Sequence, residues 1–215
     1  MKKIIFFALL LALSPCLAAA KDITVDDITA KMEAADKNVN SLEFDFKQEI
    51  IYNLTNEKQT NSGHVAYMKP ENIYVKQHSP LDQEIVSNGK RVWIYTPKYH
   101  QVIVDNWKKW ASNSFVPVSI INFGKGWKDL KKKYAITYEG IDDNKYVLLF
   151  KPAGEEAIKM KFWVSADDFV PVKVVLTGEN VTINTEMINK SLNPKLDKKL
   201  FIFQAPSGVD VMNLP

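Results

Sequence analysis

Residues 42–50 read Leu-Glu-Phe-Asp-Phe-Lys-Gln-Glu-Ile, and this stretch decides the fold class. Apolar and charged side chains alternate along it, and a period of two places them on opposite faces of a strand. The apolar set is Leu42, Phe44, Phe46 and Ile50, and the charged set is Glu43, Asp45, Lys47 and Glu49. The pattern therefore indicates an antiparallel strand with one buried face.

Similar short runs follow on both sides of one long interruption. The expected strands are residues 63–68, 72–78, 83–87, 91–96, 101–105, 134–141, 146–151, 158–164, 172–177, 181–189 and 201–203. Turn residues separate them, and Asn88-Gly89 favours a hairpin in which both residues take a positive φ. Ten or eleven strands at near-regular spacing predict a single antiparallel sheet, which must curl.

Two segments have helical rather than strand periodicity. Residues 24–38 carry apolar side chains at spacings of three and four, with Thr24 as the expected N-cap. The second segment falls in the interruption at 107–133, where residues 112–123 with Pro117 near the start suit a short helix. This apolar interval either closes one end of a core or forms a lid over an apolar cavity.

The first twenty residues differ from the rest. Lys2 and Lys3 precede an apolar run of ten residues, and Ala18-Ala19-Ala20 supplies the small residues of a signal peptidase site. A membrane-spanning helix needs roughly 20 apolar residues, so this run is too short to be one. We expect a cleaved signal peptide at 1–20 and one domain at 21–215, with 195 residues and a net charge lowered from +3 to +1.

Cys16, the single cysteine, offers an alternative N-terminus. A cysteine after such an apolar run can be the lipidated residue of a bacterial lipoprotein. Pro15 fits poorly in a peptidase cleft because its backbone is locked. Cleavage after Ala20, which removes Cys16, is therefore favoured.

Composition and motifs indicate neither a nucleic-acid partner nor catalysis. Charges nearly balance, with 28 basic and 25 acidic residues, whereas nucleic-acid binders carry a concentrated positive field. His64, His78 and His100 share no metal-ligand spacing. No G-x-S-x-G elbow or phosphate-binding loop occurs. The Lys131-Lys132-Lys133 run is either a solvated face or a docking site for an acidic partner or anionic lipid.

Four phrases, in order along the chain, resemble the LolA family of periplasmic carriers of outer-membrane lipoproteins. They are Phe46-Lys47-Gln48 for F-x-Q, Gly63 with Met68-Lys69-Pro70 for G…[KR]-P, residues 87–97 for S-[DN]-G-K-x-h-W-h-Y-x-P (h apolar), and residues 201–211 for F-x-F-x-x-P-x-G-V-x-V. From the strand that begins at residue 42 to the last of these motifs, which ends at residue 211, the resemblance spans nearly the whole mature chain.

The resemblance implies a mainly β fold: an incomplete barrel of about eleven antiparallel strands, covered by an N-terminal helix and short inserted helices that form a lid. It implies a monomeric periplasmic protein that is not an enzyme and needs no cofactor or metal. This protein would take acylated lipoproteins from an inner-membrane lipoprotein-releasing ABC transporter and pass them to an outer-membrane lipoprotein acceptor.

Site residues follow from this resemblance and the strand pattern. The expected acyl-chain cavity is lined by Phe44, Phe46, Ile50, Ile73 and Val75, and the lid residues facing it are Phe115, Val118 and Ile121. Lys69 is the candidate latch of the lid, at a position where the family often has arginine. Lysine lacks the planar fork of donors that arginine presents, which weakens a multi-bonded latch.

Three other functions remain open from the sequence. The same fold could serve as a sensor domain that binds lipid or lipoprotein and regulates a partner. It could also be a lipidated outer-membrane acceptor if Cys16 is retained. A secreted hydrolase is disfavoured because no catalytic constellation is present.

The exported protein should begin at Lys21, because the A-x-A site ends at Ala20. Intact-mass measurement of the protein from a periplasmic extract checks this directly. A lipidated N-terminus at Cys16 would instead support the acceptor alternative.

Overall fold

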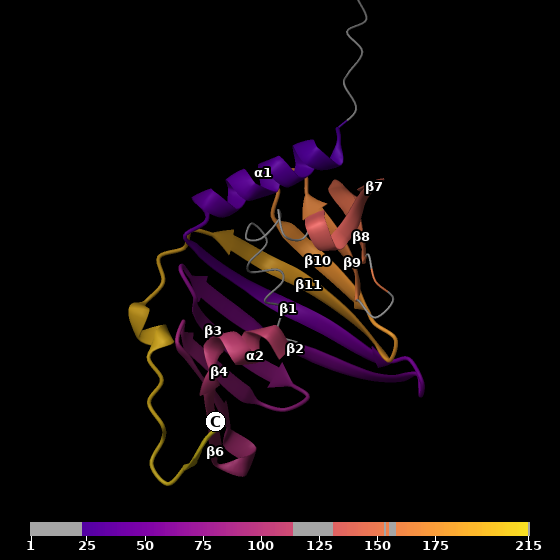
Figure 1. Ribbon diagram of the computed structural model, residues 1–215. Helices are drawn as coiled ribbons and strands as arrows, with labels where there is room; N and C mark the ends of the chain where they lie inside the picture. Colours follow the sequence, from indigo (N-terminus) through magenta and orange to yellow (C-terminus); the bar gives the residue numbers. More distant parts are fainter. Residues whose placement is uncertain (1–22, 114–130, 153, 155–157, 215) are drawn as a thin grey trace, which may run out of the picture.

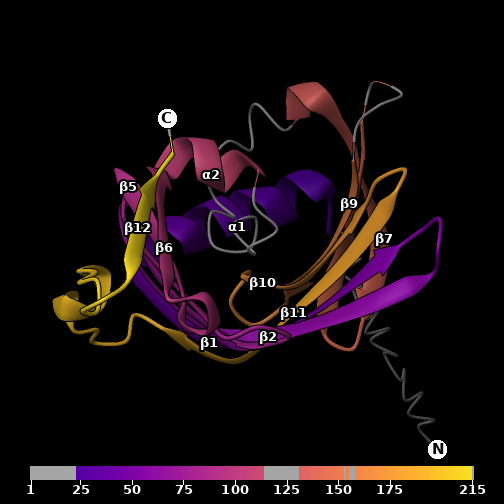
Figure 2. The same cartoon turned by 90° about the horizontal axis from the view of Figure 1, so that it is seen from below.

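The computed structural model describes residues 23–113, 131–152, 154 and 158–214. Twelve strands form one sheet in the order β12-β6-β5-β4-β3-β2-β1-β11-β10-β9-β8-β7. The sheet curls without closing, and its inner face turns toward the helices α1 and α2 (Figures 1 and 2). The mainly β fold with an incomplete barrel and helical cover is thus confirmed. No helix in the described ranges is long and apolar enough to cross a membrane.

Most strands occupy the stretches expected from the alternating pattern. Their bounds are β1 Ser41–Tyr52, β2 Glu57–Met68, β3 Asn72–Ser79, β4 Gln83–Asn88, β5 Arg91–Thr96, β6 Gln101–Asn106, β7 Tyr134–Asp142, β8 Lys145–Pro152, β9 Lys159–Ser165, β10 Pro171–Thr177, β11 Val181–Leu192 and β12 Asp210–Asn213. Strand β2 begins six residues before its expected start. Its added residues are all polar, so the period-two pattern of apolar side chains does not extend over them.

Helix α1 (Val25–Asn38) begins where the sequence predicts. The hydroxyl of Thr24 accepts from the backbone N–H of Asp27 at 3.1 Å, and the Asp27 carboxylate accepts from the backbone N–H of Thr24 at 3.0 Å. This capping box satisfies two donors that a helix start would otherwise leave unpaired. Ile28 and Met32 on the apolar stripe are fully buried.

The core lies between α1 and the inner face of the sheet. Leu42 and Phe44 of β1 are fully buried there, in one cluster with Ile28 and Met32. Strand β1 pairs with β2 on one side and β11 on the other, so it occupies the middle of the sheet. The stretch that predicts the strand therefore also supplies the centre of the core.

The C-terminal region corrects one strand prediction. Residues 201–203 do not form a strand: a 3-10 helix, η2 (Lys198–Phe201), ends there, and Asp197 caps it by accepting from the backbone N–H of Lys199 at 2.9 Å. Phe201 is buried and Phe203 stacks on Trp93 of β5, with ring centroids 6.2 Å apart. The aromatic pattern thus reflects packing against the sheet rather than pairing within it.

The twelfth strand, β12, is missing from the expected set. It pairs in parallel with β6, which departs from the expected purely antiparallel sheet. All four of its residues are exposed. A strand without a buried face lacks the alternation on which sequence-based recognition depends.

The turn between β4 and β5 also differs in detail from its prediction. Gly89 has a φ of +82°, but Asn88 is not among the residues with positive φ. Instead, the Asn88 carboxamide oxygen accepts from the backbone N–H groups of Lys90 and Arg91, each at 3.0 Å. Asn88 therefore stabilises the turn through its side chain and leaves the positive φ to glycine.

Gly63 allows β1, β2 and β3 to approach closely, and alanine there should destabilise the protein. An added Cβ would lie 2.3 Å from the Lys76 carbonyl oxygen and 2.8 Å from the Phe46 ring. We expect Gly63→Ala to lower the free energy of unfolding by about 1–3 kcal/mol, as overpacking does. Urea unfolding measures this effect.

Gly178→Ala is the matched control, because its nearest neighbour would lie at an ordinary 3.6 Å. Equal stability of the two variants would show that the crowding at Gly63 is relieved by small shifts.

Candidate binding cavity

The inner face of the sheet is hollowed beyond the part that α1 covers. A cavity of about 590 Å³ opens there. Its described lining residues are Phe46, Gln48, Ile50, Tyr52, Gln59, Asn61, Val75, Gln77, Gln83, Ile85, Ile94, Ile103, Trp110, Asn180 and Val181. They come from β1 to β6, α2, the β10–β11 turn and the start of β11, and none of them carries a charge.

The expected cavity residues divide into two groups. Phe46, Ile50 and Val75 line the cavity. Phe44 and Ile73 are outside this lining and are 0% and 1% exposed in the core cluster, to which Phe46 and Val75 also belong. The two groups occupy successive inward positions of the same strands, so the core grades into the cavity along the sheet.

Helix α2 (Trp107–Asn113) contributes to the cavity from the interval expected to hold a lid. It begins earlier than residue 112 because Asn106 caps it, accepting from the backbone N–H groups of Lys108 and Lys109 at 2.9 and 3.2 Å. Trp107 is buried against Trp110, with ring centroids 5.7 Å apart, and Trp110 lines the cavity. The lid residues Phe115, Val118 and Ile121 lie outside the described residues.

Lys69, the candidate latch, contacts α1. Its ammonium group donates to the backbone carbonyl of Asp36 in the last turn and lies 3.9 Å from the Asp36 carboxylate. A cation at this end interacts favourably with the helix dipole. The backbone N–H of Lys69 also donates to the Asn40 carbonyl at 2.8 Å. Lys69 therefore connects the β2–β3 turn to one end of α1.

Lys131 makes a second connection to α1, at its opposite end. Its ammonium group lies 2.8 Å from the carboxylate of Asp26. The Asp26 side chain is 87% exposed, so solvent screens this pair and it contributes little to stability. Of the two contacts, the one at Lys69 is the more sheltered.

Besides Asn180 in the β10–β11 turn, five amide side chains that the sequence pattern does not single out line the cavity from β1 to β4: Gln48, Gln59, Asn61, Gln77 and Gln83. We call this set the amide belt. Gln59 donates to Asn61 at 2.9 Å, Asn61 donates to Gln48 at 2.9 Å, and Gln48 donates to the hydroxyl of Thr185 at 3.0 Å. These bonds join β2, β1 and β11 across the inner face.

The belt continues on β3 and β4. Gln77 and Gln83 are paired in register, and Gln83 donates to the Thr96 hydroxyl of β5 at 3.1 Å. Gln77 donates to the Leu81 carbonyl at 3.1 Å. A register shift at Ser62 and Gly63 separates the two parts of the belt. The period of two places Gln48 on the inner face with Phe46 and Ile50, whereas its polarity alone would have assigned it to the outer face.

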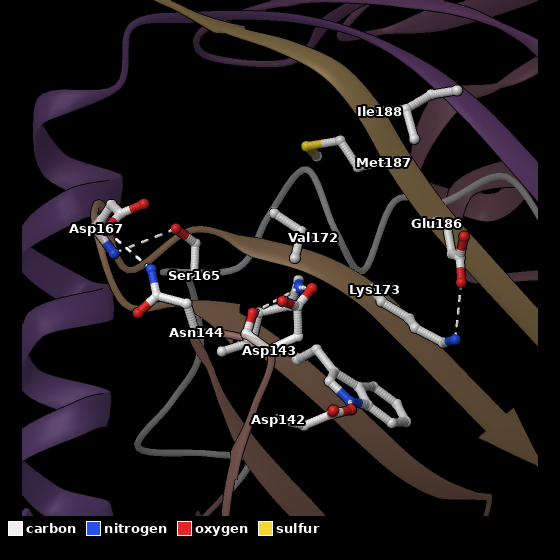
Figure 3. A pocket seen from close by; sticks show the side chains of 12 residues that line it. Asp142, Asp143, Asn144, Ser165, Asp167, Val172, Lys173, Glu186, Met187 and Ile188 are labelled. Atoms are coloured by element: carbon white, nitrogen blue, oxygen red, sulfur yellow. Dashed lines mark hydrogen bonds and ion pairs between the residues drawn. The ribbon is translucent and has the colours of Figure 1, made fainter.

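A second pocket, of about 580 Å³, lies near the β7–β8 turn and over β9 to β11 (Figure 3). Four of its six charged side chains form ion pairs: Lys173 with Glu186 at 2.7 Å and Lys145 with Asp143 at 2.6 Å. The indole N–H of Trp163 donates to Asp142 at 2.8 Å. The two pockets have nearly equal volumes, but this one is lined by charges and is unsuited to hydrocarbon.

His64 is placed between two carboxylates on β1. Its ring nitrogens lie 2.8 Å from Asp45 and 3.1 Å from Glu43. A hydrogen bond from Asn189, followed by that from His64, lowers the pKa of the Asp45 carboxyl below its usual range. Asp45 belongs to the charged set of β1, on the face opposite Phe46, so this cluster is separate from the cavity.

Comparison with known proteins identifies relatives over most of the chain. The family model described as outer membrane lipoprotein carrier protein LolA matches residues 37–204. An outer-membrane lipoprotein carrier protein of Bordetella avium is 30% identical over 206 residues, which cover 95% of this chain and 94% of that protein. One from Francisella tularensis subsp. tularensis is 28% identical over 196 residues, covering 89% and 91%.

Solved structures share the fold at lower identity. An uncharacterized conserved protein of Thermus thermophilus superposes with a TM-score of 0.58 at 12% identity, covering 88% of this chain and 98% of that one. Pseudomonas aeruginosa MucB, in its complex with MucA, gives 0.51 at 16% identity, covering 83% of this chain and 60% of that one.

Removing the Lys69 ammonium should loosen the end of α1. We expect Lys69→Met to speed backbone hydrogen exchange at residues 32–38 by about tenfold, since a cation at a helix C-terminus is worth up to about 2 kcal/mol. Hydrogen exchange followed by mass spectrometry measures this. Lys58→Met, at an exposed ion pair with Glu49, is the control. Unchanged exchange in Lys69→Met would show that the Lys69 ammonium does not hold this end of α1.

Proposed function

The chain belongs to the LolA family of outer-membrane lipoprotein carrier proteins, and from this premise we propose that it binds the acyl chains of lipoproteins in its inner cavity. In this proposal the exported protein works in the periplasm as a monomer. It receives lipoproteins from a releasing ABC transporter of the inner membrane and delivers them to an acceptor at the outer membrane. It carries out no catalysis.

The observation that carries the proposal is the uncharged cavity of about 590 Å³ on the inner face. Phe46, Val75 and Ile94 offer apolar contact there, and Trp110 adds an aromatic ring from α2. Ligand sites are commonly concave and mostly apolar, with a few polar groups. A hydrocarbon chain that enters this space removes water from no charged side chain, because the described lining contains none.

Physical chemistry explains why a lipoprotein needs such a carrier. Each buried methylene contributes about 0.8 kcal/mol, so a chain of roughly fifteen resists leaving a bilayer by ~12 kcal/mol. Two or three chains on one lipoprotein make unaided escape negligible. A soluble carrier must offer comparable apolar surface and yet release the chains, so its cover has to be displaceable.

The contacts of α1 suit a displaceable cover. Its polar connections to other described elements include the Lys69 ammonium and the Asn193 carboxamide, which donates to the Asn38 carbonyl at 3.0 Å, at one end. At the other end lies the exposed Lys131–Asp26 pair. Movement of α1 away from the sheet would break few polar bonds, while exposing Ile28 and Met32 to acyl chains that could replace their packing partners. In this proposal Lys69 acts as the latch, and Phe115, Val118 and Ile121 form the rest of the lid.

The alternative of a domain that regulates a partner protein is supported only by fold likeness to MucB, whose structure was solved in complex with MucA. MucB is 16% identical to this chain, which covers 60% of the MucB chain. The carrier relatives match instead over more than nine-tenths of their own length. The carrier function is therefore the better supported of the two.

Transfer of a radiolabelled lipoprotein from inner-membrane vesicles to the purified soluble protein tests the proposal. We expect the wild-type protein to take up lipoprotein, and mass spectrometry of the product to show acylated species. Ile103→Asp should lower uptake by about tenfold, because a carboxylate in the cavity would have to lose water without a partner.

Ile141→Asp is the control, since Ile141 is 65% exposed and away from the cavity lining. It should leave uptake unchanged. Absence of uptake by the wild-type protein would contradict the carrier function. Uptake by folded Ile103→Asp at the wild-type level would place the binding site elsewhere.

A further inference from the structure

The five amide side chains of the belt are unexpected in a cavity that binds hydrocarbon alone. Gln48 and Asn61 are 4% and 6% exposed, yet they face a space also lined by Phe46 and Ile50. On β1, Gln48 stands between these two apolar side chains, so the belt crosses the apolar lining rather than bordering it. An acyl chain lying on the belt would displace water from the amides without replacing their hydrogen bonds, which costs free energy.

The amides retain capacity for a ligand. A primary amide has two N–H donors and two acceptor lone pairs. Gln77 and Gln83 each donate one N–H to a neighbour, and both are half-buried, so the other positions are available to a molecule in the cavity. Meanwhile the Gln59–Asn61–Gln48–Thr185 bonds hold the remaining amides in place.

The charge of the lining restricts what the belt can recognise. None of the described cavity residues is Asp, Glu, Lys, Arg or His. A phosphate or a free carboxylate would therefore enter without a cationic partner, which is unfavourable. Neutral carbonyl and N–H groups match the belt, because an amide side chain can both donate to a carbonyl and accept from an N–H.

We propose that the amide belt binds the uncharged ester and amide groups that join acyl chains to the modified cysteine of a lipoprotein. The inference rests on the proposed carrier function and adds a polar subsite to it. The acyl chains then lie on the apolar side of the belt toward α1, against Phe46, Val75 and Ile85. Binding through the linkage gives selectivity for acylated protein over fatty acids and phospholipids.

Two synthetic probes separate the linkage from the chains. One is a triacylated lipopeptide, with two ester-linked and one amide-linked palmitoyl chain on an S-glyceryl cysteine. The other is identical except that ethers replace both esters, so it carries chains of equal length, stays uncharged and lacks the two ester carbonyls. Calorimetric titration gives both dissociation constants. We expect the wild-type protein to prefer the first probe by about tenfold, the effect of one or two net hydrogen bonds.

The double variant Gln77→Leu/Gln83→Leu should lose this preference while still binding the ether probe. Gln204→Leu is the matched control, because Gln204 is exposed and outside the cavity lining. If the double variant fails to fold, Gln83→Leu alone makes the same comparison at a half-buried position. Thermal unfolding verifies that each variant is folded.

The outcomes distinguish this inference from the function on which it rests. Equal affinity of the wild-type protein for the two probes, or an unchanged preference in the folded variant, would overturn the role of the belt and leave the carrier function intact. Binding of neither probe would contradict the carrier function itself. Affinity for palmitate or a phospholipid equal to that for the lipopeptide would overturn the selectivity for an uncharged linkage.

Discussion

The packing of α1 on the inner face of the sheet is the contact on which the rest of the structure depends. A sheet that curls without closing leaves the apolar side chains of its inner face in contact with water unless another element covers them. Ile28 and Met32 bury that face against Leu42 and Phe44, each contributing about 1.5–3 kcal/mol. Because α1 covers only one end, the remaining inner face is left as the cavity. The fold therefore needs a cover over its apolar face, and the same packing leaves a cavity beyond α1.

The character of the lining then separates the two pockets. Their volumes are nearly equal, but one is surrounded by ion pairs and the other by uncharged side chains. Hydrocarbon entering the charged pocket would remove water from ionised side chains, which costs free energy, whereas the uncharged lining imposes no such cost. The amide belt refines this distinction, because it adds hydrogen-bonding groups without adding charge. Apolar contact supplies affinity in such a site, and the placed polar groups supply orientation.

Sequence periodicity predicts the central part of the fold well. The alternation at 42–50 places β1, and Thr24 with the stripe through Ile28 and Met32 places α1. The pattern fails where burial and polarity disagree. Phe201 and Phe203 pack on the sheet without pairing in it, and β12 pairs without being buried. Gln48 and Asn61 are polar but face inward, so a rule that sends polar residues to solvent overlooks them. Phe44 and Phe46 both belong to the core cluster, but only Phe46 also lines the cavity, and the alternation of β1 does not reveal this difference.

Bromine-labelled acyl chains test most directly whether the inner face holds the lipid. Bromine quenches indole fluorescence only at short range, and the chain has five tryptophans, of which Trp110 lines the cavity while Trp163 lines the charged pocket. In variants that keep one of these two and replace the other four tryptophans with phenylalanine, a brominated lipopeptide should quench Trp110 and leave Trp163 unaffected. Quenching of Trp163 with Trp110 unchanged would contradict an acyl-chain site inside the sheet.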